Sequence, residues 1–260
     1  MYPEERQQAI ASLVMSRGRA SVAELAEAYA VTTETVRRDL AVLDRSGVLR
    51  RVHGGAVPAR ALHLAEPGVA ERETTRTDHK NAIAACAADF FPMTTATVLF
   101  DAGTTTARVA ALLPTDREVV VVTNSVPIAA RVSMLPSVTV HLLGGRVRGL
   151  TQAAVGSQAL AALQALRVDI AFIGTNGISI DHGLSTPDAE EAAIKRAMVE
   201  AANYVVVVAD SSKIGREEFV SFASIDSVDA LVTDSEITET DRAALTERGV
   251  EVVVAGQEQP

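Results

Sequence analysis

The chain has 260 residues, of which 48% are hydrophobic, enough for two modest domains with a buried core. The single cysteine, Cys86, excludes an internal disulfide, and we find neither a signal-peptide pattern nor an apolar run of about 18 residues. We therefore expect a cytoplasmic protein with no membrane partner.

The net charge of −9 is unevenly distributed along the chain. Residues 1–60 hold nine arginines and seven acidic residues, a charge of +2, which leaves −11 on residues 61–260. A basic amino-terminal part on an acidic body is typical of a protein that contacts nucleic-acid phosphates at one end only. All three lysines, Lys80, Lys195 and Lys213, lie in the acidic body.

The first 58 residues have the pattern of a winged helix-turn-helix domain. The stretch "EERQQAIASLVMSRG" predicts a first helix, and Ser21 with Glu24 forms a capping box for a second. A further capping box at Thr32 or Thr33 starts the helix "ETVRRDLAVLDRSG". The following "VLRRVHGGAV" alternates apolar and basic residues around Gly54 and Gly55, which predicts a hairpin.

The rest of the chain predicts a linker over residues 59–77 and an α/β domain over residues 78–260. The stretch from Pro58 to Thr77 has two prolines, mixed charge and no sustained period. Helical patterns then alternate with β-branched runs: "ATVLF", "EVVVVT", "VTVHLL", "VDIAFIG", "YVVVVAD", "VDALVTD" and "VEVVVA". Such runs are typical of strands buried on both faces, so we expect a Rossmann-like three-layer α/β/α domain with a mainly parallel sheet.

The third predicted helix carries the candidate DNA-reading residues. The start of a recognition helix faces base edges, arginine can bind guanine with two hydrogen bonds, and threonine hydroxyls suit bases or phosphates. In isolation "RRD" would be a solvated surface, and Asp39 is expected to pair with an arginine. The candidates, including three basic residues of the wing, are Thr32, Thr33, Thr35, Arg37, Arg38, Arg50, Arg51 and His53.

This amino-terminal part resembles the DeoR family of regulators. The resemblance is carried by "ERQQAI", "SVAELAEAYAVTTETVRRDL" and "RRVHGGAV". It implies that "TVRRDL" belongs to the recognition helix and that double-stranded DNA is a partner.

The body contains a candidate ligand site at the ends of its predicted strands. In "FDAGTTT", Gly103 allows close approach of a ligand, and the threonine hydroxyls and following N–H groups attract an anion. Further polar turns follow other strands, including Thr123 and Asn124, and Gly144 and Gly145. Each turn alone is typical of ordinary loops, and each lysine alone could be a surface charge. Ligands of open α/β sheets bind at this edge, and a phosphate would give the three lysines a common role.

The body also resembles the DeoR-family sensor domain, which is similar in fold to ribose-5-phosphate isomerase. The motifs are "DAGTTT", "TNS", "LLGG", "VDIAFIGTNGI", "GLST", "EAAIKRAM" and "ADSSKIG". The resemblance implies a phosphorylated sugar or polyol held by Asp101, Gly103, Thr104 and Thr105, with Lys80 and Lys195 as charge partners. In the isomerases two carboxylates move a proton, but Ile173 and Asn176 stand at their apparent places.

We therefore expect a transcriptional regulator rather than an enzyme, with no catalytic residue, no metal and no cofactor. It would repress a carbohydrate-uptake or catabolic operon, such as one of a phosphotransferase system, and a sugar phosphate would relieve repression. The expected effector site comprises Lys80, Asp101, Gly103, Thr104, Thr105, Thr123, Asn124, Gly144, Gly145, Lys195 and Lys213. The bodies would form a homodimer or homotetramer. Two alternatives are a sugar-phosphate isomerase or deaminase with a fused DNA-binding head, and a body that serves only in oligomerisation.

Overall fold

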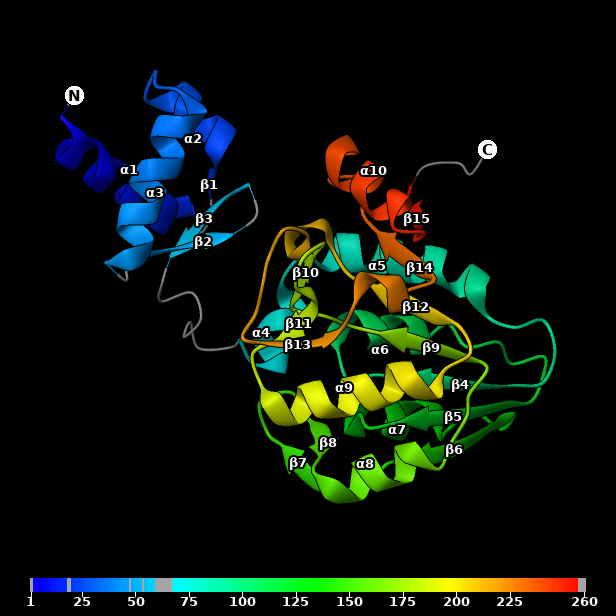
Figure 1. Cartoon of the computed structure of the whole chain (residues 1–260). Helices are drawn as coiled ribbons and strands as arrows, with labels where there is room; N and C mark the ends of the chain where they lie inside the picture. Colours follow the sequence, from blue (N-terminus) through cyan, green and yellow to red (C-terminus); the bar gives the residue numbers. More distant parts are fainter. Residues whose placement is uncertain (1, 18–19, 47, 53, 59–66, 257–260) are drawn as a thin grey trace. The chain divides into compact units, whose positions relative to one another are not determined.

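The computed structural model describes residues 2–17, 20–46, 48–52, 54–58 and 67–256, and it divides into an N-terminal unit, Met1–Glu66, and a C-terminal unit, Pro67–Pro260. Figure 1 labels their helices and strands. Among the described residues, no helix is long and apolar enough to cross a membrane.

The N-terminal unit is a three-helix domain with a small antiparallel sheet of order β1-β3-β2. Its elements are α1 (Pro3–Arg17), β1 (Ala20–Ser21), α2 (Val22–Ala28), α3 (Thr33–Arg45), β2 (Leu49–Val52) and β3 (Gly55–Pro58). The predicted helices and the hairpin are confirmed. The apolar core includes Ile10 of α1, Leu25 of α2, and Val36 and Leu40 of α3, so the three helices share one buried cluster.

Caps and glycines define the turns of the N-terminal unit. The Ser21–Glu24 capping box is present as predicted. Helix α3 begins after Thr32, whose hydroxyl accepts from the Thr35 N–H, but no capping box forms because Thr35 occupies the position that a glutamate would need. Of Gly54 and Gly55, only Gly54 has a positive φ, of 77°. A Cβ on Gly55 would lie 2.4 Å from the Ala20 oxygen, which explains the second glycine.

The C-terminal unit is built on a seven-stranded parallel sheet of order β15-β14-β12-β9-β4-β5-β6. The strands are β4 (Ala96–Phe100), β5 (Val119–Thr123), β6 (Val138–Leu142), β9 (Ile170–Ile173), β12 (Val205–Val208), β14 (Ala230–Thr233) and β15 (Glu251–Val254). All seven coincide with the predicted apolar runs. The inner strands are buried on both faces, which is why they are almost entirely apolar.

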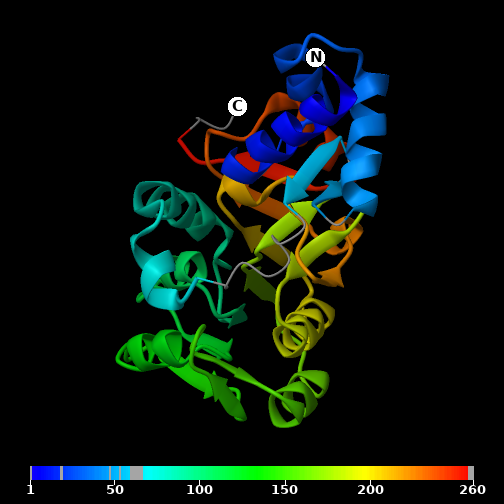
Figure 2. The same cartoon turned by 90° about the vertical axis from the view of Figure 1, so that its left-hand side faces the viewer.

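Helices cover both faces of this sheet, which confirms the three-layer architecture (Figures 1 and 2). One apolar cluster packs α5, α6 and α7 against the sheet, and a second packs α8, α9 and α10 against the other face. The helices are α4 (Val69–Thr74), α5 (Thr77–Ala87), α6 (Thr104–Ala110), α7 (Val126–Val132), α8 (Ser157–Gln164), α9 (Ala189–Ala201) and α10 (Glu239–Glu247), with 3₁₀ turns η2 (Ala88–Phe90), η3 (Ser211–Lys213) and η4 (Ile225–Ser227).

Two small antiparallel sheets complete the unit. One has the order β10-β11-β13, formed by Gly177–Ser179, Gly183–Thr186 and Val220–Ala223. The other pairs β7 (Arg146–Arg148) with β8 (Ala153–Val155). The chain pattern did not predict either sheet, because their strands have only three or four residues.

The strand order reverses between β4 and β9. From β4 the chain proceeds outward through β5 to β6, then returns to β9 beside β4 and proceeds outward to β15. At such a reversal the loops that follow the two central strands diverge and leave a crevice. The loops after Phe100 and Ile173 therefore begin the most favourable ligand site of the sheet.

Helix α4 lies inside the segment that we expected to be a linker. It has no buried residue, so no apolar period announces it in the sequence. Its start is held by the Val69 N–H, which donates to the Leu150 oxygen at 2.9 Å. The last part of residues 59–77 thus belongs to the C-terminal unit, and residues 59–66 lie outside the described residues.

Candidate effector cavity and DNA-reading helix

A cavity of about 270 Å³ opens at the carboxyl edge of the parallel sheet. Its walls come from α4, from the start of α5, from the loops after β4, β9 and β12, and from α9. The residues that the sequence analysis had placed in the site and that line the cavity are Lys80, Gly103, Thr104, Thr105, Lys195 and Lys213. All three lysines of the chain therefore lie around one space.

A buried ion pair joins the two central loops at the base of this cavity. The Lys195 ammonium contacts the Asp101 carboxylate and donates to the Gly174 oxygen at 2.9 Å. The same carboxylate accepts from the Gly174 N–H at 3.0 Å. Burial raises the pKa of Asp101, whereas the Lys195 ammonium acts in the opposite direction. The positive charge of Lys195 is thus balanced by the carboxylate of Asp101. The pair links α9 to the loops after β4 and β9.

Uncompensated positive charge gathers at the opposite wall. Lys80, Lys213, Arg72 and Arg216 line the cavity, and none of the four forms an ion pair with a carboxylate among the described residues. Burial lowers the pKa of Lys80 from 10.5 to about 8, and it lowers the pKa of Lys213 as well. A bound anion would offset this desolvation, because it stabilises the charged form of each lysine.

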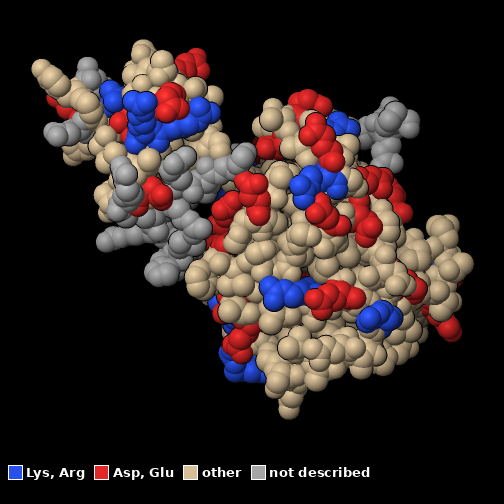
Figure 3. All heavy atoms as spheres, in the orientation of Figure 1, with Lys and Arg blue, Asp and Glu red and all other residues tan. Residues whose placement is uncertain are grey.

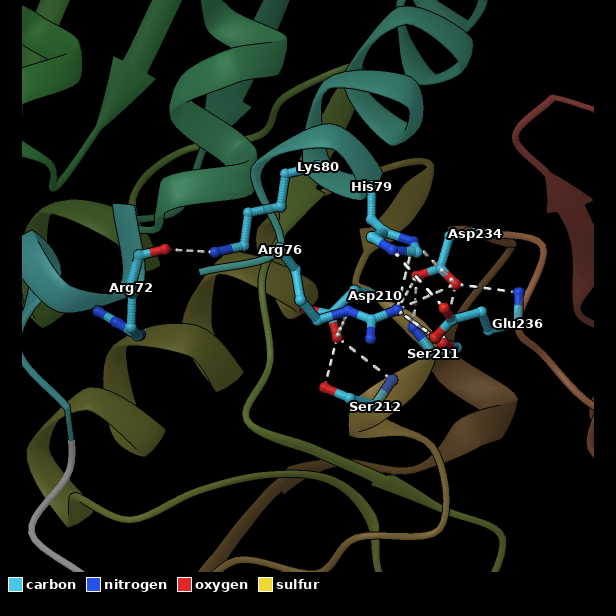
Figure 4. A network of polar contacts seen from close by, with 9 residues as sticks. All are labelled: Arg72, Arg76, His79, Lys80, Asp210, Ser211, Ser212, Asp234 and Glu236. Carbon is cyan, nitrogen blue, oxygen red and sulfur yellow. Dashed lines mark hydrogen bonds and ion pairs between the residues drawn. The ribbon is translucent and has the colours of Figure 1, made fainter. Parts of the chain in front are cut away.

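Arg76 anchors the corner between α4 and α5 to the ends of β12 and β14 (Figure 4). Its backbone is left-handed, with φ of 51°, which is uncommon for arginine. Its guanidinium lies 3.1 Å from Asp210, 3.3 Å from Asp234 and 2.7 Å from Glu236. His79 and these last two carboxylates come close enough to hold a metal ion, but the Arg76 guanidinium already occupies the space between the two acids.

The turn after β4 presents three threonines to the cavity. Thr104 and Thr105 line it, and both are almost completely buried. The Thr106 hydroxyl instead donates to the Gly103 oxygen, so it closes the turn. A Cβ on Gly103 would lie 3.0 Å from that hydroxyl, which leaves little room for a larger residue.

Five residues of the expected site lie outside the cavity wall, namely Asp101, which is held in the buried pair with Lys195, and Thr123, Asn124, Gly144 and Gly145. The Thr123 hydroxyl donates to the Phe100 oxygen at 2.7 Å. The Asn124 amide accepts from the Ala102 N–H and donates to the Ala154 oxygen. These side chains hold the loop that carries Gly103 instead of facing the cavity. Gly144 and Gly145 also do not line it.

The two positions that correspond to the isomerase carboxylates, Ile173 and Asn176, contain no group that can accept a proton. Ile173 is completely buried within the apolar cluster on one face of the sheet. Asn176 lines the cavity, and its side-chain oxygen accepts from the Thr186 hydroxyl at 3.2 Å. Neither side chain can accept a proton from a carbon atom.

Helix α3 presents a basic face on the N-terminal unit. The side chains of Arg37 and Arg38 are 56% and 81% exposed, and they make only long ion pairs with Glu34, at 3.8 and 3.5 Å. Thr33 is also exposed, whereas the hydroxyls of Thr32 and Thr35 contact each other at 2.9 Å in the cap. Figure 3 shows basic side chains gathered on the N-terminal unit.

Asp39 faces inward and fixes the rotation of α3. It is 3% exposed, lies 2.6 Å from Arg6 of α1, and accepts from Gln7 at 2.9 Å. The expectation that Asp39 pairs with an arginine is confirmed. Because Asp39 is held against α1, the neighbouring Arg37 and Arg38 are directed outward.

The candidate residues of the wing are only partly described. Arg50 and Arg51 lie on β2, paired with Val57 and Ala56, but their side chains and the whole of His53 lie outside the described residues. Their proposed DNA contacts stay predictions.

Comparison with known families identifies both units. Residues 6–60 match the DeoR-like helix-turn-helix domain, and residues 75–235 match the DeoR C terminal sensor domain. The chain belongs to the DeoR family of transcriptional regulators.

Relatives of this DeoR-family chain match it over nearly its whole length. The "HTH-type transcriptional regulator GlpR" of Haloferax volcanii is 38% identical over 97% of this chain and 98% of its own. The "Glycerol-3-phosphate regulon repressor" of Escherichia coli is 33% identical, covering 90% and 92%. Among solved structures, ribose 5-phosphate isomerase A from Methanocaldococcus jannaschii aligns over 54% of this chain and 55% of its own, at 18% identity and a TM-score of 0.39.

Sequence reasoning missed several residues of the cavity in this DeoR-family regulator. Arg72, Arg76 and Arg216 line it, together with the acids Glu191 and Asp210. Arg72 and Arg76 stand in a stretch that reads as a linker, but Arg72, Arg76 and Lys80 follow one another at intervals of four residues, which was an available signal. Four residues make about one helical turn, so this spacing favours a common face.

Proposed function

We propose that this chain is a repressor of carbohydrate-uptake or catabolic genes that releases its DNA operator when a phosphorylated sugar or polyol binds the cavity. The observation that carries the proposal is the convergence of Lys80, Lys195 and Lys213 with Arg72 and Arg216 around one space. A phosphate dianion matches several cations that have no carboxylate partner. The cytoplasmic location expected from the sequence is part of this proposal.

The name of one relative supports both repression and the class of ligand, since it is a glycerol-3-phosphate regulon repressor. A phosphorylated three-carbon to six-carbon compound is consistent with a cavity of about 270 Å³.

DNA recognition is assigned to the exposed start of α3. Thr33, Arg37 and Arg38 would contact bases or phosphates, while Thr32 and Thr35 cap the helix and Arg50, Arg51 and His53 of the wing would contact the flanking backbone. Helix-turn-helix domains usually read repeated half-sites as dimers, so we propose a homodimer or homotetramer formed through the C-terminal units.

The enzymatic alternative is not favoured. A sugar-phosphate isomerase needs a group that accepts a proton from carbon, and Ile173 and Asn176 cannot do so. Turnover of a ribose phosphate or hexosamine phosphate, lost on changing Asp101, would overturn the regulator proposal in favour of an enzyme.

A thermal-shift screen tests ligand binding directly. The full-length chain is melted with fructose 1-phosphate, fructose 1,6-bisphosphate, glycerol 3-phosphate and their unphosphorylated counterparts. A ligand present at about 100 times its dissociation constant adds about 2.7 kcal/mol to the free energy of unfolding. Stabilisation by at least one phosphorylated compound is expected. If none stabilises the chain, the C-terminal unit serves only in oligomerisation.

Effector affinity should depend on pH through Lys80. Its pKa of about 8 means that it carries a proton below pH 8 and loses it as the pH rises further. A phosphate favours the ammonium form, so affinity should fall above pH 8, by up to about tenfold per pH unit. It should also fall below about pH 6, where the phosphate monoester gains a proton. Isothermal titration calorimetry from about pH 5 to about pH 9 measures both limits.

The Lys80→Arg variant is the control for this pH dependence. Arginine keeps its proton throughout this range, so the decline above pH 8 should become shallower. An unchanged decline in Lys80→Arg would assign the effect to another group.

A further inference from the structure

Arg72 is the most unusual cation in the cavity. It lies on α4 and lines the cavity wall, and its Nε and Nη2 atoms are buried with no hydrogen-bond partner among the described residues. Burying hydrogen-bond donors of a charged group without partners is costly, so such groups are rare unless a ligand completes them. The planar guanidinium of Arg72, with two N–H donors that lack partners, can donate to two oxygens of one phosphate.

Lys80 and Lys213 lie near Arg72. The Lys80 ammonium donates to the main-chain oxygen of Arg72, as Figure 4 shows. Burial lowers the pKa of Lys80 and of Lys213, the carboxylate of Asp210 raises both, and neighbouring cations lower them further, Lys213 acting on Lys80 and Arg72 on Lys213. Asp210 is itself paired with Arg76, and among the described residues no carboxylate forms an ion pair with Arg72, Lys80 or Lys213, so a bound anion would balance the positive charge of this wall.

In the described part of the chain, two further cations of the cavity, unlike Arg216, are paired with carboxylates. Lys195 is paired with Asp101, and Arg76 with Asp210, Asp234 and Glu236. A phosphate placed beside Lys195 would have to approach the Asp101 carboxylate, which repels it. This contrast separates the cavity into a cationic end at α4 and a neutral polar end at the central loops.

We propose that the effector phosphate binds Arg72, Lys80 and Lys213 at the corner between α4 and α5, while the rest of the effector extends toward Asp101 and Lys195. This inference rests on the proposed function and names the phosphate subsite within it. The resemblance implies that Asp101, Gly103, Thr104 and Thr105 hold the ligand, with Lys80 and Lys195 as charge partners. The proposed subsite keeps Lys80 but places the phosphate on Arg72 and Lys213 instead of on the turn.

The assignment also makes α4 the element that responds to the effector. Helix α4 has no buried residue, and its backbone is tied to the unit by few contacts, among them the Arg108 donation to the Glu73 oxygen at 3.0 Å. A phosphate that bridges Arg72 of α4 to Lys80 of α5 and Lys213 of η3 adds a strong connection. Among the described residues, α4 is the first helix of the C-terminal unit, so a bound phosphate would restrain the start of that unit.

Inorganic phosphate is the probe that tests this subsite. Calorimetric titration of the full-length chain, with sodium chloride matching the ionic strength, compares the wild type with Arg72→Gln, Lys213→Gln and the exposed control Arg167→Gln. We expect the wild type and Arg167→Gln to bind phosphate alike, and Arg72→Gln and Lys213→Gln to bind at least about tenfold more weakly. Arg72→Gln removes a half-buried cation with two buried donors that lack partners, so the melting temperature of the unliganded variant should not fall.

Three results would overturn the assignment. Phosphate affinity retained in Arg72→Gln and Lys213→Gln would place the phosphate elsewhere in the cavity, and the proposed function would stand. No phosphate binding by the wild type would show that no preformed phosphate subsite exists. The proposed function would then still be decided by the thermal-shift screen with sugar phosphates. Unchanged hydrogen exchange of amides 69–75 on phosphate binding would contradict the role of α4.

Discussion

Replacing Lys195 with methionine is expected to destabilise the C-terminal unit by about 3 to 5 kcal/mol. The change leaves the completely desolvated Asp101 carboxylate without its cation and leaves the Gly174 oxygen without a donor. Urea unfolding followed by circular dichroism measures the loss.

Two matched variants separate this ion pair from general effects of removing a lysine. The double variant Asp101→Asn with Lys195→Met should recover most of the stability, because no unpaired charge remains buried. Lys213→Met removes a lysine of the same cavity that has no ion pair among the described residues, and it should cost much less. A loss for Lys195→Met no larger than that for Lys213→Met would show that the pair contributes little.

Arg37→Ala and Arg38→Ala are each expected to weaken operator binding by about 1 to 3 kcal/mol where the side chain meets a base. Both side chains are exposed on α3 and are held only by long contacts with Glu34, so they are available to DNA. Fluorescence anisotropy with a labelled operator fragment measures the affinities at one fixed salt concentration, since phosphate contacts depend on salt.

The control for charge is Arg17→Ala, at the exposed end of α1 in the same unit. It should reduce affinity less than either variant of α3. Unchanged binding in both Arg37→Ala and Arg38→Ala would place the reading surface elsewhere on the N-terminal unit.

The central sheet was readable from the sequence because parallel strands buried on both faces are almost purely apolar. The runs at Val205–Val208 and Ala230–Thr233 are examples. The small sheet β10-β11-β13 was not readable, since its strands are short and two of them, β10 and β11, begin with glycines that close contacts require. A Cβ on Gly183 would lie 2.1 Å from the Ala223 oxygen, and its φ is 72°.

The candidate site was readable where residues follow central strands, as Asp101, Gly103 and Thr104 do. The order of strands decides which loops meet, and a sequence pattern does not contain that order. Thr123 and Asn124 accordingly support the neighbouring loop instead of lining the cavity. Arg72 was missed for a different reason: α4 buries nothing, so its cavity-facing cation has no apolar pattern beside it.

Operator affinity measured with and without phosphorylated sugars tests the central claim most directly. Fluorescence anisotropy of the full-length chain on its operator, titrated with fructose 1-phosphate, fructose 1,6-bisphosphate or glycerol 3-phosphate, should give at least about tenfold weaker binding with one of them, a coupling of about 1.4 kcal/mol. The effect should vanish in Arg72→Gln, which should still bind the operator. A ligand that binds the cavity yet leaves operator affinity unchanged would contradict the account, because equal affinity for both states shifts no equilibrium.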